Sequence, residues 1–252
     1  VERARAAVGV PLLIGAVLAE PVGASSNVSL FYTGEGVEPQ RYTKLHPVPF
    51  AEYMPSRDFF RRFSSAVDLA GNFVAGSEIG VFTVPSSGGE YAALPTICFE
   101  VAYDGLMRDS VLAAGERESL LVVQTNNATF ASPDRLTGTA QPEQQAAMSV
   151  LRSIEHGRSS MIAATSGVSM IVNPDGTVAA RAEMFEQAVL EADVPLRDSI
   201  SLSDRLGAWP ELLLATAGGA ALVVAIRLHW KARRTAASES VEARPRLPVD
   251  VR

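Results

Sequence analysis

The chain has 252 residues, 47% of them hydrophobic, and a formal net charge of −6 at pH 7. The charge is uneven, because residues 227–252 carry +4 and the remainder carries −10. An acidic body of this kind excludes a nucleic-acid partner held by basic contacts to phosphate. A single cysteine, Cys98, excludes an internal disulfide.

The first half of the chain predicts strands followed by a helix and a hairpin. Residues 1–7 read as the end of a helix, and the apolar run 8–18 predicts a strand buried on both faces. A second strand is predicted at 27–33. Phenylalanines at helical spacing predict an amphipathic helix over 56–69. Residues 79–84 and 91–99, joined by a turn with two glycines, predict a hairpin.

The second half alternates between helices and strands. Helices are predicted at 104–114, closed by Gly115, and at 142–156, with a proline in the first turn. The predicted strands lie at 120–125, 160–165, 168–172, 177–183 and 188–194. This alternation, with hairpins inserted, favours a layered α/β domain with a mixed sheet over residues 1–204.

A membrane helix is predicted over residues 206–228. Residues 212–226 carry no charge, and extending the segment back to Leu206 reaches the roughly 20 residues that a span needs. Trp209 and Trp230 bracket it, as interfacial aromatic residues do, and Arg227 and Lys231 lie at its carboxyl end. The positive-inside rule then places a basic, disordered tail, 229–252, in the cytoplasm and the α/β domain on the outer side.

Two segments carry groups suited to covalent catalysis. Cys98 ends an apolar run and is followed at once by Phe99 and Glu100, which predicts a nucleophile presented at a sheet edge. A stiff, proline-rich loop upstream contains Lys44 and Glu52. The alternative for the cysteine alone is a buried structural thiol. No residue spacing suggests a metal site or a glycine-rich phosphate loop, so no cofactor is expected.

Residues 42–55 and 97–100, with matches at 125–130, 153–158 and 172–176, resemble the apolipoprotein N-acyltransferase family. This family is a membrane-embedded branch of the nitrilase, or carbon–nitrogen hydrolase, superfamily. The resemblance implies an αββα sandwich and a Glu–Lys–Cys triad in which Cys98 is the nucleophile and Lys44 the lysine. Glu52 and Glu100 match two further glutamates of the family. The triad glutamate has no match here and is expected upstream of Val1, so the chain is expected to be the C-terminal part of a longer, multi-pass protein of the cell membrane.

The resemblance also implies a reaction and its partners. The Cys98 thiolate would take an acyl chain from a phospholipid, and the α-amino group of a diacylglyceryl apolipoprotein would then accept it. Lys44 would stabilise the oxyanion, and Glu52 would orient Lys44. Glu100 reads equally well as a catalytic group or as a structural hydrogen-bond acceptor, and His46 as a structural loop residue.

Two other functions remain open at this point. A membrane-anchored amidase or other nitrilase-like hydrolase would use the same residues with water as the acceptor. A catalytically incomplete, membrane-tethered interaction domain would need none of them. The apolar segment at 212–226 favours a membrane enzyme over a soluble hydrolase, because a soluble hydrolase has no use for it.

Overall fold

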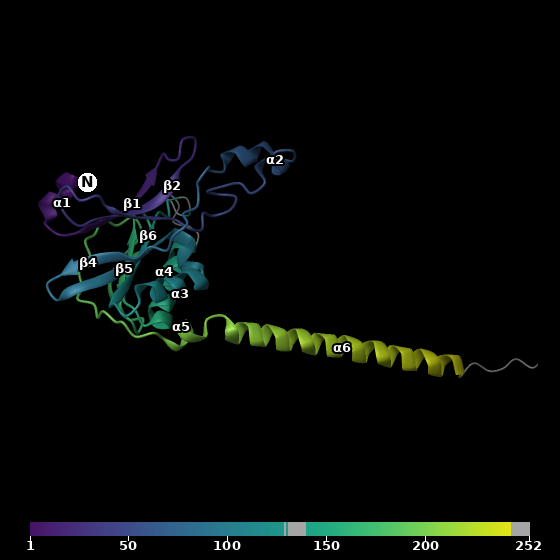
Figure 1. The fold of residues 1–252 in the computed structure, drawn as a ribbon. Coiled ribbons are helices and arrows are strands. Elements are labelled where there is room, and N and C mark those ends of the chain that lie inside the picture. The colour runs from purple at the N-terminus through teal and green to yellow at the C-terminus, as the bar shows by residue number, and fades with distance from the viewer. Residues whose placement is uncertain (129, 131–139, 243–252) are drawn as a thin grey trace, which may run out of the picture. The chain divides into compact units, whose positions relative to one another are not determined.

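The computed structural model describes residues 1–128, 130 and 140–242 and divides the chain into two units, Val1–Arg205 and Leu206–Arg252. Figure 1 labels many of the elements of both units. The first unit contains, in chain order, α1 (Glu2–Val8), β1 (Leu12–Leu18), β2 (Ser26–Tyr32), β3 (Gln40–Thr43), α2 (Arg57–Phe60), the 3-10 helix η1 (Ser65–Leu69), β4 (Phe82–Ser86), β5 (Gly89–Ile97), the 3-10 helix η2 (Cys98–Ala102), α3 (Asp104–Ala114), β6 (Ser119–Thr125), α4 (Gln141–His156), β7 (Ser160–Ala164), β8 (Ser169–Val172), β9 (Val178–Ala182) and α5 (Leu202–Leu206, whose last residue begins the second unit).

The smaller sheet is antiparallel, in the order β1-β2-β3. Its central strand β2 is the most buried, whereas β1 is only half-buried and Val17 is 63% exposed. The prediction that this run is buried on both faces is therefore wrong, because no residue of β1 is fully buried. Strand β3 was not predicted, since its four residues contain only one apolar side chain, Tyr42.

The larger sheet has six strands in the order β4-β5-β6-β7-β8-β9. The pairs β5–β6 and β6–β7 are parallel and the other pairs are antiparallel, which confirms the predicted mixed sheet. All seven residues of β6 are buried, as expected for a central parallel strand covered on both faces.

The two sheets pack face to face, and helices cover the far side of the larger one. One core cluster joins β2 and β3 to β4, β5 and β6. Two more lie between the larger sheet and the helices α3 and α4, which Figure 1 shows beside β5 and β6. These are a β, a β and an α layer of the nitrilase-like sandwich that the family resemblance implies.

Residues 56–69 do not form the predicted amphipathic helix. Helix α2 ends at Phe60, and η1 begins only at Ser65. The guanidinium of Arg57 donates to the carbonyl oxygens of residues 67, 70 and 71, which folds the segment back on itself. The prediction failed because the aromatic spacing is helical, but the described residues offer these rings no surface to cover them.

The strand predicted at 188–194 is also absent from the described residues, where this segment is irregular. It leads into residues 195–205, which we call the C-terminal strap. Polar groups of the domain hold the strap through Ser119 N–H to the Arg197 carbonyl (2.9 Å), Ser159 Oγ to the Pro195 carbonyl (2.7 Å), Arg158 Nη1 to the Ser199 carbonyl (2.8 Å), Arg108 Nε to the Asp204 carbonyl (2.6 Å) and His156 Nδ1 to Asp204 Oδ1 (2.6 Å).

The second unit is dominated by one long helix, α6 (Trp209–Glu242). Its segment Trp209–Lys231 has 23 residues and a mean hydropathy of 1.8, so it is long and apolar enough to cross a membrane. None of the most apolar part of this segment is buried. The helix continues through 235–242, and the rest of the predicted tail, 243–252, lies outside the described residues.

Candidate active site

Cys98 lies immediately after the carboxyl end of β5, where the parallel strands β5 and β6 end side by side. Groups at the carboxyl ends of parallel strands are well placed to meet a ligand. Cys98 begins η2 with φ of 58°, a left-handed backbone conformation that is rare for residues other than glycine. The thiol is half-buried, and the strained backbone marks this turn as a candidate functional site.

Lys44 follows β3 directly and is fully buried, with 0% of the residue exposed. Its ammonium group pairs with both carboxylate oxygens of Glu52, at 2.9 and 2.7 Å. Glu52 also accepts hydrogen bonds from Asn27 Nδ2 at 2.6 Å and from the Val48 N–H at 2.7 Å. A buried cation is therefore held in one position by a carboxylate that is itself fixed.

Glu100 is buried without any basic partner among its described contacts. Its Oε1 accepts the N–H groups of Leu45 and His46, at 2.7 and 3.0 Å. Its Oε2 accepts the Ile97 N–H and the Tyr42 hydroxyl, both at 2.8 Å. One carboxylate thus joins the residues that follow Lys44 to the residue that precedes Cys98.

The surroundings of Glu100 perturb its tyrosine partner. Burial raises the pKa of Tyr42 well above its usual range, and the charge and hydrogen bond of Glu100 raise it further. The phenol therefore stays protonated and acts as a donor.

Of the four predicted site residues, Lys44 and Glu52 are in direct contact, and Glu100 binds the backbone on both sides of the site. Cys98 and Leu45 pack against the same core cluster. The local sequence predicts no role for Asn27 or Tyr42, which bind Glu52 and Glu100, respectively. These contacts depend on how β2 pairs with β3 and on how the two sheets pack, neither of which has a signal in the local sequence.

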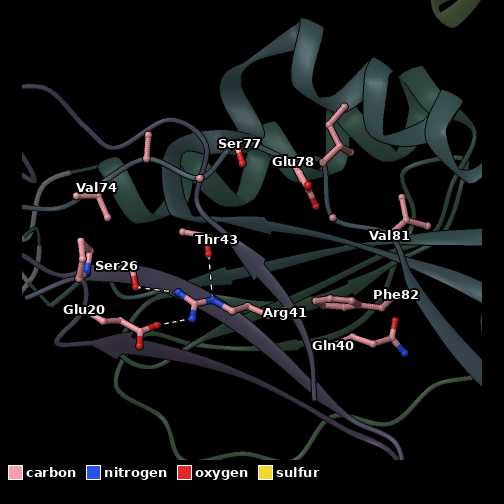
Figure 2. Close-up of a pocket in the computed structure, with 15 residues that line it drawn as sticks. Glu20, Ser26, Gln40, Arg41, Thr43, Val74, Ser77, Glu78, Val81 and Phe82 are labelled. Atoms are coloured by element: carbon pink, nitrogen blue, oxygen red, sulfur yellow. Dashed lines mark hydrogen bonds and ion pairs between the residues drawn. The ribbon is translucent and has the colours of Figure 1, made fainter. Parts of the chain in front are cut away.

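A cavity of about 750 Å³ lies on the other side of β3, as Figure 2 shows. Side chains alternate along a strand, so Arg41 and Thr43 face this cavity while Tyr42 and Lys44 face the core. Arg41 is already engaged by Glu20, by Thr43 Oγ1 at 3.1 Å and by Ser26 Oγ at 3.2 Å. None of the four predicted site residues lines the cavity, so we do not take it as the reaction site.

Near Glu52, four phenylalanines form an exposed aromatic cluster: Phe50, Phe59, Phe60 and Phe63. They are 61, 52, 36 and 74% exposed, and their rings contact one another at centroid distances of 5.3–5.9 Å. An exposed cluster of large apolar side chains is a candidate surface for contact with another molecule.

Within the part of the chain that the structure describes, no three His, Cys, Asp or Glu side chains are grouped so that they could hold a metal ion. The side chains at the candidate site offer one thiol, one ammonium group and two carboxylates. These groups suit acyl transfer through a covalent intermediate.

Comparisons with known proteins find a matching family, related sequences and similar solved structures. A family described as carbon-nitrogen hydrolase matches residues 9–203. An apolipoprotein N-acyltransferase from Mycolicibacterium smegmatis is 34% identical over 88% of this chain and 36% of its own length. One from Bradyrhizobium diazoefficiens is 30% identical over 74% of this chain and 32% of its own length. The chain thus spans about a third of the length of these relatives. A solved structure of a mutant amidase from Nesterenkonia sp. AN1 is also similar (18% identity, TM-score 0.49, 72% of this chain and 61% of that one).

Proposed function

Because the chain belongs to the carbon-nitrogen hydrolase family, we propose that it forms the part of an N-acyltransferase that carries the nucleophile and its lysine. The observation that carries this proposal is the bridge made by Glu100 between the Lys44 loop and the Cys98 turn. A chain that only bound partners would have no need to hold a buried ammonium group and a strained cysteine in one arrangement.

The proposed reaction has two acyl transfers. In the first, the Cys98 sulfur attacks an ester carbonyl of a phospholipid, so that a C–S bond forms, the C–O bond breaks and a lysophospholipid leaves with a proton. In the second, the α-amino group of a diacylglyceryl apolipoprotein attacks the thioester. A C–N bond forms, the C–S bond breaks and the thiol regains its proton.

The contacts suggest separate roles for the charged residues. We propose that Lys44 stabilises the oxyanion of both tetrahedral intermediates and that Glu52 orients Lys44. Neither Glu52 nor Glu100 has a free oxygen, because their described contacts already supply four hydrogen bonds to each. The general base is therefore proposed to be a third carboxylate, and Glu100 to be a positioning group.

Two surfaces support a lipid partner. Phe50 of the exposed aromatic cluster lies two residues before Glu52, and aromatic side chains of this kind suit the boundary between lipid headgroups and acyl chains. The apolar segment Trp209–Lys231 supports attachment to a membrane. We propose a multi-pass protein of the cell membrane, with the sandwich on the extracytoplasmic side, because basic residues follow α6's apolar segment.

The central test is to trap the thioester. The full-length protein is mixed with phospholipid vesicles in detergent, quenched in acid and analysed by intact mass spectrometry. We expect an added mass equal to one acyl chain, lost on treatment with neutral hydroxylamine. The variants Cys98→Ser and Cys98→Ala should carry no hydroxylamine-sensitive adduct.

The acceptor is tested with a synthetic diacylglyceryl peptide. An N-acylated peptide supports the transferase, whereas free fatty acid formed at the same rate with and without the peptide indicates a hydrolase. Peptide N-acylation by the Cys98→Ala variant would refute the assignment of the nucleophile.

A further inference from the structure

Glu100 is held by four donors of two kinds. In the part of the chain that the structure describes, three are backbone N–H groups, of Leu45, His46 and Ile97, and one is a side-chain hydroxyl, that of Tyr42. Backbone donors remain whatever side chains occupy their positions. The phenol of Tyr42 is therefore the contact of Glu100 that the sequence can remove without changing the backbone.

The Tyr42 ring has little room to move. It is 2% exposed and belongs to the core cluster between the two sheets. A Cβ atom at Gly80 would lie 2.8 Å from two atoms of the ring, so the ring occupies the space that a side chain there would need. Packing of this density fixes the hydroxyl in the direction of Glu100, at 2.8 Å from Oε2.

A second contact joins the same two segments. The ring of His46, two residues after Lys44, stacks on Tyr103 with centroids 4.4 Å apart and an interplanar angle of 21°. Tyr103 directly follows η2, the turn that begins with Cys98. The Lys44 loop and the Cys98 turn are therefore held together by a carboxylate on one side and by a ring stack on the other.

We propose that Tyr42 is a positioning residue that acts through Glu100 to keep the Lys44 loop and the Cys98 turn in register. The inference rests on the proposed function, because it gives this register a role in the reactivity of the Cys98 thiol. Tyr42 touches neither the sulfur nor the acyl group and acts by fixing the carboxylate that binds both segments.

The test uses the 252-residue chain in detergent micelles, in which Cys98 is the single cysteine, so that iodoacetamide alkylation reports on this thiol alone. Tyr42→Phe removes the hydroxyl and keeps the ring. Tyr91→Phe is the matched control, since Tyr91 packs against the same core cluster but does not bind Glu100 in the structure. Both changes are also made in a Glu100→Gln background.

We expect Tyr42→Phe to slow alkylation at pH 7 about fivefold, the effect of losing one hydrogen bond, and Tyr91→Phe to leave it within twofold. In the Glu100→Gln background, Tyr42→Phe should have no further effect, because the amide that faces Tyr42 no longer accepts the Ile97 N–H and so no longer joins the two segments. A purely structural role would slow alkylation equally in both backgrounds.

Three results would overturn the proposal. In the first, the Tyr42→Phe variant is alkylated at the rate of the unchanged chain. In the second, the substitution lowers the alkylation rate by the same factor with and without Glu100. In the third, the variant is alkylated at the rate of the chain unfolded in urea. Failure of the proposed function is a separate outcome. It would appear as no thioester with phospholipid in the full-length protein, while the alkylation rates still follow the expected pattern.

Discussion

The C-terminal strap leads to a prediction about one buried carboxylate. Asp204 is fully buried and accepts His156 Nδ1 at 2.6 Å, Ser201 Oγ at 2.9 Å and the Ser201 N–H at 3.3 Å. Asp204→Asn keeps the shape of this side chain and removes its charge. The strap should then open more often, because its contact with His156 weakens.

The size of the effect follows from the contacts. A hydrogen bond to a charged group contributes about 1.5–3 kcal/mol and a neutral one about 0.5–1.5 kcal/mol. In Asp204→Asn, the two short hydrogen bonds, from His156 Nδ1 and Ser201 Oγ, lose their charged acceptor, and each loss costs roughly 1 kcal/mol. A total of about 2 kcal/mol corresponds to opening that is about 30-fold more frequent.

The effect should depend on pH. Burial alone would raise the pKa of Asp204, but the hydrogen bond and charge of His156, together with the Ser201 donors, outweigh it and hold the pKa below its usual range. A lowered pKa means that the carboxylate stabilises the fold above the unfolded pKa of about 3.9 and ceases to do so as the pH falls through the folded value. The difference in strap opening between the unchanged chain and the Asp204→Asn variant should therefore be full at pH 7 and shrink below about pH 4.

Hydrogen exchange read by mass spectrometry measures this opening in detergent micelles. The reporters are peptides covering the strap and the Ser119 N–H, which donates to the Arg197 carbonyl at 2.9 Å. Asp193→Asn is the matched control, because Asp193 is an exposed carboxylate two residues before the strap. Exchange in Asp204→Asn within threefold of the unchanged chain, or an equal change in the control, would refute the reasoning.

Two further predictions concern the turn that holds the nucleophile. Cys98→Gly should be about 1 kcal/mol more stable to urea than Cys98→Ala, because φ of 58° strains any side chain but not glycine; equal unfolding midpoints would contradict this. Glu100→Gln should lower the free energy of unfolding by about 3 kcal/mol, since the amide can turn its NH₂ group to the Tyr42 oxygen but leaves the Ile97 N–H without an acceptor. A loss below 1 kcal/mol, by urea unfolding followed with tyrosine circular dichroism, would count against the four-donor arrangement.

Sequence patterning correctly predicted the elements in which the burial of the side chains agrees with the local conformational preference. The run at β6 is apolar throughout most of its length and lies in the middle of the sheet, and α4 has both a proline start and a glycine end. In such elements, local preference and burial agree, so that the sequence alone is enough.

The failures share one cause, which is that spacing does not reveal a partner surface. Residues 56–69 have helical aromatic spacing but lack a neighbour among the described residues to cover those rings. Strand β3 is polar in three of its four residues and exists because it pairs with β2. A strand formed by its partner leaves almost no trace in its own sequence.

At the candidate site, the resemblance to a family supplied Lys44, Cys98 and two glutamates, and local sequence supplied the position of Cys98 at a strand end. Neither the resemblance nor the local sequence predicts the roles of Tyr42 and Asn27. Tyr42 pairs with Ser29 across β2 and β3, and its hydroxyl reaches a residue 58 positions later in the chain. Contacts of this range depend on how the sheets pack and not on any local motif.

The left-handed backbone at Cys98 has a consequence for reading related genomes. If a related lineage lost the acyl-transfer reaction, selection for cysteine at this position would end, while the left-handed backbone of the turn would remain. Mutational drift at this site should then favour glycine over alanine or serine, since glycine alone relaxes the turn. A glycine aligned with this position would therefore indicate a relative that has kept the fold and lost the catalytic activity.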